Sequence, residues 1–176
     1  QITVDPSSAL RRGDAVSALQ ATFSEVQRVG QTLQDLIAEA DQRIANGVDE
    51  AQSLIDRIHQ LNGEIRLNQR TGADATGAEN AQSALIDQLS TLMDVRASAV
   101  EGGGVHVRTS GGALLVGVQP AQLSYTATSA DFSSHGVIRI NESLGTLSNL
   151  EPMLLGGELK GLIQVRDNDL AGLAQA

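Results

Sequence analysis

The chain has 176 residues, a formal net charge of −9, no cysteine, and only two Phe, one Tyr and no Trp. Without cysteine, neither a disulfide framework nor thiolate chemistry is available. Nucleic-acid-binding surfaces are basic and offer aromatic rings for base stacking, so this composition predicts no nucleic-acid partner. No apolar run reaches the roughly 20 residues that a membrane-spanning helix needs, which predicts no membrane insertion.

The N-terminal residues indicate how the chain starts. Residues 1–4 alternate polar and apolar, and Asp5 followed by Pro6 is a typical helix start. Gln1 opens the chain without the basic region and apolar core of a signal peptide. The missing initiator Met, and an ending inside a helical pattern, predict that the sequence is a piece of a longer protein.

Apolar or small residues recur at an unbroken heptad spacing over residues 16–65. The large side chains of this pattern, which we call the helix seam, are Val16, Leu19, Phe23, Val26, Leu33, Ile37, Ile44, Leu54, Ile58, Leu61 and Ile65. A period of 3.5 residues keeps one face of a helix against a long partner. The spacing therefore predicts one long helix, or two nearly collinear helices, in an antiparallel bundle.

Two glycines, Gly30 and Gly47, occupy positions of the seam where large side chains are expected. Glycine inside a helix is about 1 kcal/mol less favourable than alanine. Its presence therefore predicts close approach of a neighbouring element, or a bend. At Gly30 a break of the helix is an equal alternative, whereas at Gly47 we expect close packing or a kink.

A second helical pattern follows a short polar loop. Residues 78–95 carry apolar side chains on one face, and the loop over 68–77 is short enough to predict antiparallel packing against the first helix. The second helix is much shorter than the first. The early part of the seam, residues 16–36, therefore needs another partner.

The C-terminal part of the chain predicts a small antiparallel sheet and a returning helix. Glycines at 102–104 end the helical half, and Gly111 with Gly112 is a good hairpin turn. Four β-like segments, separated by turn residues, predict a sheet of three or four strands; they are 105–109, 113–118, 122–128 and 137–140. Residues 141–152 are predicted to be a loop, and a helical pattern over 159–173 returns to the bundle.

These patterns together predict an α+β fold, in which a long antiparallel helical bundle carries a small antiparallel β lobe. The predicted domain organisation has three parts: residues 1–101 form the long-helix part of the rod, 102–150 the β lobe, and 151–176 the returning, truncated helix of the rod.

Four segments, taken in chain order, resemble the flagellar hook-associated protein 1 family. They are LNGEI at 61–65, LIDQLSTLMDV at 85–95, GGALLVG at 111–117, and GGELKGL at 156–162 leading into VRD at 165–167. The resemblance covers the chain from Asp5 onward. One departure is the segment NAQS at 80–83, where many members carry acidic residues and arginine. A salt bridge made by that segment in relatives is not expected here.

The resemblance implies a flagellin-like rod domain in a structural subunit that joins the flagellar hook to the filament. It implies self-association into a junction ring that transmits torque, with the hook protein and the second hook-associated protein as neighbours. It further implies an extracellular location in the bacterial flagellum, reached through the flagellar type III apparatus without a cleaved signal peptide. An export chaperone would bind the full-length chain, and terminal helices on both sides of this piece would mediate axial packing.

The titratable residues do not predict an enzyme, a cofactor or a metal site. His59, His106 and His135 are scattered over a predicted helix, strand and loop, whereas a metal site needs convergent ligands. The carboxylates of Asp167 and Asp169 are most simply solvated in so acidic a chain. No serine lies in a Gly-x-Ser-x-Gly motif, and the glycine-rich runs lack a phosphate-binding pattern.

A different class of function stays open on the sequence. The chain would then be a non-flagellar coiled-coil surface or secreted protein whose β lobe binds a peptide or a glycan. The aromatic residues Tyr125 and Phe132 would favour this alternative if they lined a concave polar surface.

Overall fold

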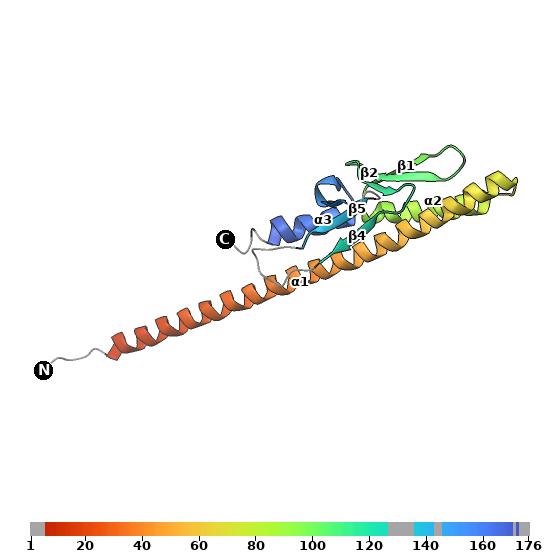
Figure 1. Ribbon diagram of the computed structural model, residues 1–176. Coiled ribbons are helices and arrows are strands. Elements are labelled where there is room, and N and C mark those ends of the chain that lie inside the picture. The colour runs from red at the N-terminus through yellow and green to blue at the C-terminus, as the bar shows by residue number, and fades with distance from the viewer. Residues whose placement is uncertain (1–5, 127–135, 143–145, 171, 173–176) are drawn as a thin grey trace.

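One helix organises the molecule. The computed structural model describes residues 6–126, 136–142, 146–170 and 172. Helix α1, Pro6–Thr71, has 66 residues, which at 1.5 Å per residue corresponds to a rod of about 100 Å. All other described elements pack along the C-terminal half of α1, and its N-terminal half projects alone (Figure 1).

Helix α1 is continuous through both seam glycines, so the prediction of one long helix is confirmed and the alternative of a break at Gly30 is wrong. The residues on either side of Gly30, Val29 and Gln31, keep the helical conformation. The penalty for one glycine is about 1 kcal/mol, which a long run of helix-forming residues on both sides offsets.

Helix α2, Thr76–Leu92, packs antiparallel to α1 after a tight turn, as predicted. Gly72 takes a φ of 72° in that turn, and the Asp74 carboxylate accepts hydrogen bonds from the Thr76 amide at 2.9 Å and the Thr76 hydroxyl at 2.7 Å. These bonds hold the pKa of Asp74 below its ordinary value. The helix ends at Leu92 rather than at residue 95, because Met93 turns to an extended conformation.

Within the described ranges, six strands form two antiparallel three-stranded sheets, ordered β1-β2-β3 and β4-β5-β6, where a single sheet of three or four strands was expected. Their bounds are β1 Val95–Ala99, β2 Val105–Thr109, β3 Leu114–Val116, β4 Gln122–Tyr125, β5 Ile138–Glu142 and β6 Thr146–Asn149. Two of these strands were not predicted. β1 lies inside the range assigned to the long-helix part, and β6 lies in the range 141–152 expected to be a loop.

The two glycine-rich turns shape the first sheet. Gly102, Gly103 and Gly104 all take positive φ in the turn between β1 and β2, so they connect two strands instead of ending the helical half. Between β2 and β3, Gly112 takes a φ of 103°, and its amide donates to the Thr109 carbonyl at 2.9 Å. The predicted hairpin turn at this position is therefore present.

The chain returns to α1 through three short helical segments. They are η1 Glu151–Met153, α3 Glu158–Gln164 and η2 Val165–Leu170, the last wound as a π-helix. The predicted returning helix is thus present, although residue 173 of its pattern lies outside the described residues.

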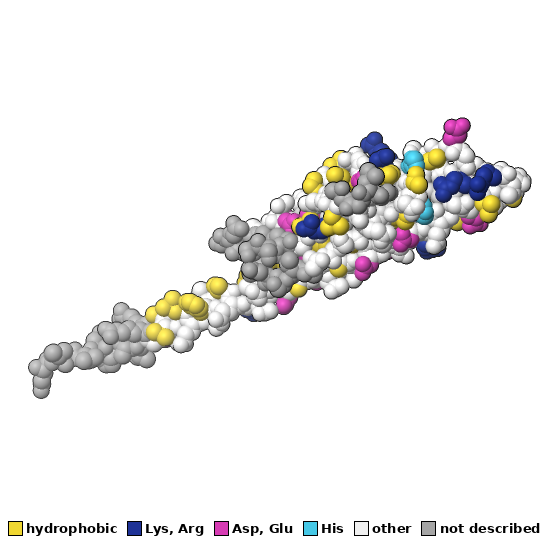
Figure 2. All heavy atoms as spheres, in the orientation of Figure 1, with side chains coloured by type: hydrophobic (Ala, Val, Ile, Leu, Met, Phe, Trp, Pro, Cys, Tyr) yellow, Lys and Arg dark blue, Asp and Glu magenta, His cyan; other side chains and the backbone are white. Residues whose placement is uncertain are grey.

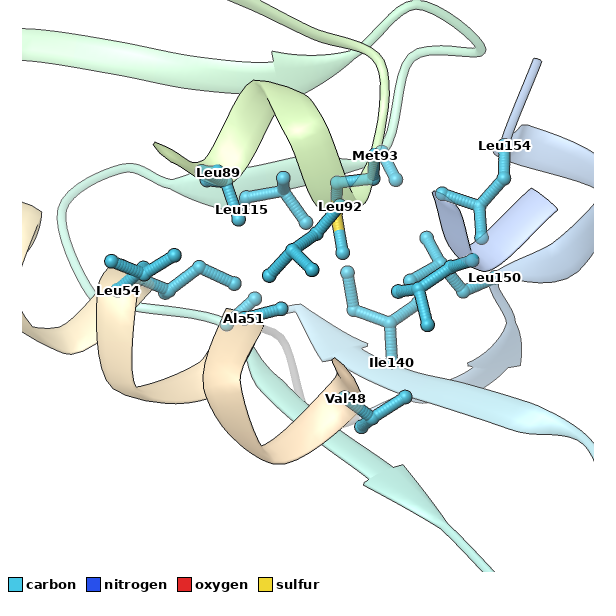
Figure 3. Close-up of a cluster of buried hydrophobic side chains, with 14 of the residues drawn as sticks. Val48, Ala51, Leu54, Leu89, Leu92, Met93, Leu115, Ile140, Leu150 and Leu154 are labelled. Atoms are coloured by element: carbon cyan, nitrogen blue, oxygen red, sulfur yellow. The ribbon is translucent and has the colours of Figure 1, made fainter. Parts of the chain in front are cut away.

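A single core joins α1, α2, both sheets and α3 (Figure 3). The cluster includes Ala51 and Leu54 of α1, Leu89 and Leu92 of α2, and Ile140 of β5. The α+β prediction is confirmed, and the core lies entirely beside the C-terminal half of α1.

The helix seam and the buried arginine cluster

The C-terminal part of the helix seam is buried within the chain. Its residues from position 37 onward lie under η2, α3, the sheets and α2 (Figure 1). Five are buried and Leu61 is half-buried; the buried ones are Ile37, Ile44, Leu54, Ile58 and Ile65. Burial of a large aliphatic side chain contributes about 1.5–3 kcal/mol, so this part of the seam stabilises the fold.

The N-terminal part of the seam has no partner among the described residues. Val16, Leu19, Phe23 and Val26, which we call the exposed stripe, have exposed fractions from 52% at Val16 to 70% at Phe23. Leu33 is half-buried. Figure 2 shows hydrophobic atoms gathered along one side of the projecting part of α1. A contiguous apolar surface of this kind marks an interaction site.

The two seam glycines have different surroundings. A Cβ atom added at Gly47 would lie 2.9 Å from Leu159 Cδ2, so the absence of a side chain lets α3 pack closely on α1. A Cβ atom at Gly30 would meet nothing within 4 Å among the described residues. Close packing thus occurs at Gly47, and the described part of the chain supplies no close neighbour for Gly30.

A buried arginine ties α1 to the returning helix and the second sheet. The Arg166 side chain is only 1% exposed. Its Nη1 donates to the Tyr125 hydroxyl at 2.7 Å and to Asp41 Oδ1 at 3.2 Å, and its Nε donates to Asp167 Oδ1 at 2.5 Å. The Tyr125 hydroxyl donates to Asp41, and Glu151 Oε1 lies 3.7 Å from Arg166 Nη2.

The electrostatics of this arginine cluster keep both Arg166 charged and Tyr125 neutral. Burial alone would lower the pKa of Arg166, but hydrogen bonds to Asp167 and the surrounding negative charge raise it instead. Burial raises the pKa of Tyr125, and its hydrogen bond to Asp41 adds to the shift. Three carboxylates surround one guanidinium, so removal of Arg166 would leave negative charges facing one another in a largely dry site.

Sequence reasoning missed this cluster, and it treated Asp167 as a solvated carboxylate. One signal was available: Arg166 lies at the same helical spacing as Leu159, Ile163 and Leu170, on the apolar face of the returning helix. An arginine at such a position needs buried partners. Which carboxylates it meets could not be read from the sequence, because Asp41 lies 125 positions away in the chain.

The remaining candidate sites are open or scattered. A groove of about 410 Å³ runs between α1 and α2, lined by Arg57, Gln60, Leu61, Glu64, Ala81, Ala84, Leu85 and Gln88. His59 is half-buried on α1, and its Nδ1 has no hydrogen-bond partner among the residues that the structure describes. His106 lies on β2, and His135 lies outside the described residues. No group of three potential metal ligands occurs in the part of the chain that the structure describes.

Within the described ranges, no helix combines the length and the apolar character that crossing a membrane requires.

A long helix with a half-covered apolar seam, braced at one end by small sheets, defines an elongated structural module. The whole chain, residues 1–176, matches the family model described as the flagellar hook-associated protein FlgK helical domain. The chain belongs to this family, which confirms the resemblance found in the sequence.

Individual relatives agree with this assignment. The chain is 25% identical over 169 residues to flagellar hook-associated protein 1 of Salmonella typhimurium, and 25% identical over 171 residues to that of Escherichia coli K12. Each alignment covers 94% of this chain and 30% of the relative. The solved hook junction protein FlgK of Burkholderia pseudomallei matches with a TM-score of 0.75 at 24% identity, over 92% of this chain and 29% of that chain, which supports the fold.

Proposed function

We propose that this chain is the rod part of a structural subunit that joins the flagellar hook to the filament. The observation that carries the proposal is the match of the entire chain to the hook-associated protein helical domain. The curated relatives are hook-associated proteins of the flagellum, and the chain spans 30% of their length. A structural role also agrees with an architecture in which one helix of 66 residues dominates.

In this proposal the rod works by packing and by resisting bending. Residues 1–101 and 151–176 carry load along the rod axis, and the β lobe at 102–150, together with β1, braces one end of α1. The subunits associate into a ring between the hook protein and the second hook-associated protein. The exposed stripe is the surface on which further helices of the assembly pack, because large apolar side chains gain about 1.5–3 kcal/mol each on burial.

The proposal includes a route and a location. The full-length chain would be escorted by an export chaperone, leave through the flagellar type III apparatus without a cleaved signal peptide, and act outside the cell. The alternative of a peptide- or glycan-binding β lobe gains no support from Tyr125, whose hydroxyl is engaged by Asp41 and Arg166. Phe132, the other aromatic residue of that alternative, lies outside the described residues.

The test uses cells whose only copy of the whole gene lacks residues 1–176, beside a strain with the intact gene restored. We expect hooks to assemble and filaments to be shed into the medium, with loss of motility. Filaments that stay firmly attached in the deletion strain would exclude the junction role.

A second strain separates the exposed stripe from the folded core. It carries Leu19→Asp with Phe23→Asp in the whole gene, and a matched control carries two changes on exposed polar positions of the same helix, Gln20→Asp and Ser24→Asp. We expect filament loss only in the first strain, with normal amounts of exported protein in both.

A further inference from the structure

The hairpin of β1 and β2 carries two arginines directly opposite each other. Arg96 and Arg108 are register partners in the ladder, and both side chains are exposed. Residues directly opposite in a hydrogen-bonded antiparallel pair have Cα atoms about 5.5 Å apart, and like charges in this arrangement are destabilising. The same strand face also carries Ser98 and His106, which are register partners two positions further along the ladder. We call these four residues the basic hairpin face.

Neither arginine of this face has a carboxylate at ion-pair distance within the described part of the chain. Arg108 Nη1 donates to the Gly112 carbonyl at 3.3 Å. Glu101 lies five positions from Arg96, about 17 Å along an extended strand, which exceeds the screening length of about 8 Å at physiological salt. Two carboxylates lie closer to the arginines without pairing with them. Asp94, two positions from Arg96, accepts the Leu155 amide through Oδ1 at 2.9 Å, and its Oδ2 makes no hydrogen bond among the described residues. Glu142 accepts the amide of Leu114, the register partner of Arg108, at 3.2 Å. Figure 2 shows Lys or Arg and His atoms over the hairpin.

A complementary pair of carboxylates lies on the outer face of α1. Asp35 and Glu39 are exposed and four residues apart on the helix. Side chains at this spacing have Cβ atoms about 5–6 Å apart, which matches the separation of the two opposed arginines. Asp35 accepts one hydrogen bond, at Oδ1 from Gln31 at 3.1 Å, and its other carboxylate oxygen makes no hydrogen bond within the described ranges. Of the neighbouring exposed positions, Gln42 is uncharged, and Arg43, four residues after Glu39, pairs with Glu158 at 3.1 Å.

The two surfaces cannot meet within one molecule. Asn62 of α1 anchors the hairpin through bonds to the Val105 amide at 2.6 Å and carbonyl at 2.7 Å. Along α1, Asn62 is about 35 Å from Glu39, and Arg108 is only about 10 Å along β2 from Val105. Because a gap of about 25 Å remains, these arginines and carboxylates can pair only between two copies of the chain.

We propose that the basic hairpin face of one copy docks on Asp35 and Glu39 of α1 in a neighbouring copy. Such a contact uses different surfaces on the two partners, so it propagates from subunit to subunit and closes into a ring if the rotation allows. It also relieves the repulsion between Arg96 and Arg108 in a chain whose net charge of −9 otherwise keeps copies apart. The proposal rests on the proposed self-association into a ring and names one of its contacts.

Charge exchange in the purified 176-residue chain tests the contact. Sedimentation velocity at low ionic strength should show concentration-dependent association, weakened at least about tenfold at 0.5 M salt because exposed charges are screened. The variant R96E with R108E should be monomeric, and so should D35K with E39K. An equimolar mixture of the two variants should associate again, because the exchanged charges are complementary.

A matched control separates the contact from general repulsion. Arg66→Glu with Arg70→Glu changes the net charge as much as the hairpin variant does, at the end of α1, and should associate more strongly than the hairpin variant. All variants should keep the parent's circular dichroism spectrum, because the substituted side chains are exposed or, at Arg66, half-buried, and none belongs to the core.

Three results would overturn the inference. They are a parent chain that stays monomeric at roughly 1 mM and low salt, a hairpin variant that associates like the parent, and a mixture that fails to associate. The deletion experiment in cells does not depend on any of these results, so it tests the junction role independently of this contact.

Discussion

The two halves of α1 share one heptad pattern and have opposite surroundings. From Ile37 onward the seam is buried under the sheets, α2 and α3, with Ile44 and Ile58 at 0% exposure, whereas Phe23 in the first half is 70% exposed. The side chains are of the same kind in both halves. An unbroken heptad pattern of apolar residues therefore predicts that this face of the helix packs against a partner. It does not predict whether the partner comes from this part of the protein.

A charged substitution in the buried part of the seam is expected to have the largest effect on stability. Ile44→Asp or Ile58→Asp would bury an unpaired carboxylate, which we expect to destabilise the chain by about 4 kcal/mol or to prevent folding. Leu19→Asp in the exposed stripe should leave the melting of this chain unchanged. Thermal melting followed by circular dichroism measures both, and a parent-like melt of Ile44→Asp would show that the assigned register is wrong.

Loss of the arginine cluster is expected to have the second-largest effect on stability. Arg166→Met removes the guanidinium that faces Asp41, Glu151 and Asp167, and loss of one partner from a buried ion pair typically destabilises by about 3 kcal/mol or more. The expected result is a lower urea midpoint and faster amide exchange in β4 and β5. Arg28→Met, which breaks the exposed pair with Glu25, is the control and should melt like the parent. Equal behaviour of the two variants would contradict a stabilising role for the cluster.

Substitutions at the two seam glycines compare the two halves of α1 and are expected to change stability by smaller amounts. Gly30→Ala should stabilise the first half of α1 by up to about 1 kcal/mol, because alanine favours the helix and nothing lies within 4 Å of the new atom. Gly47→Ala gains the same propensity, but Leu159 has to move, so the net change should stay within about 0.5 kcal/mol. Amide exchange around each position measures the difference. A larger gain at Gly47 than at Gly30 would mean that α3 does not pack on α1 as described.

The smallest effect concerns pH. The pKa of Tyr125 is raised above its ordinary value of about 10 by burial and by its bond to Asp41. An unfolded chain therefore loses this proton first, so the stabilising contribution is complete below pH 10 and declines as the pH rises towards the folded pKa. Tyr125 is the only tyrosine and the chain has no Trp, so ultraviolet absorbance of the phenolate follows it alone. Titration near pH 10 in the folded chain would contradict the buried arrangement.

The parts of the fold that were predicted correctly carry strong local signals. The seam spacing identifies α1, the polar loop and apolar face identify α2, and Gly111 with Gly112 identifies a hairpin. Strand β1 was missed because Ala97, Ser98 and Ala99 have weak strand preference, and only pairing with β2 makes the segment a strand. Strand β6 was missed for a similar reason: its composition gives weak strand preference, and pairing with β5 makes the segment a strand.

The sequence by itself determined the register of the apolar face of α1, the α+β class and the resemblance to the hook-associated family. These properties follow from periodicity and from residue order, which are local. Only the tertiary structure decided which half of the seam is covered, that Arg166 meets Asp41 and Tyr125, and that Arg96 stands opposite Arg108. Each of these depends on contacts between distant residues, and their energies come from burial and charge in three dimensions rather than from neighbours in the chain.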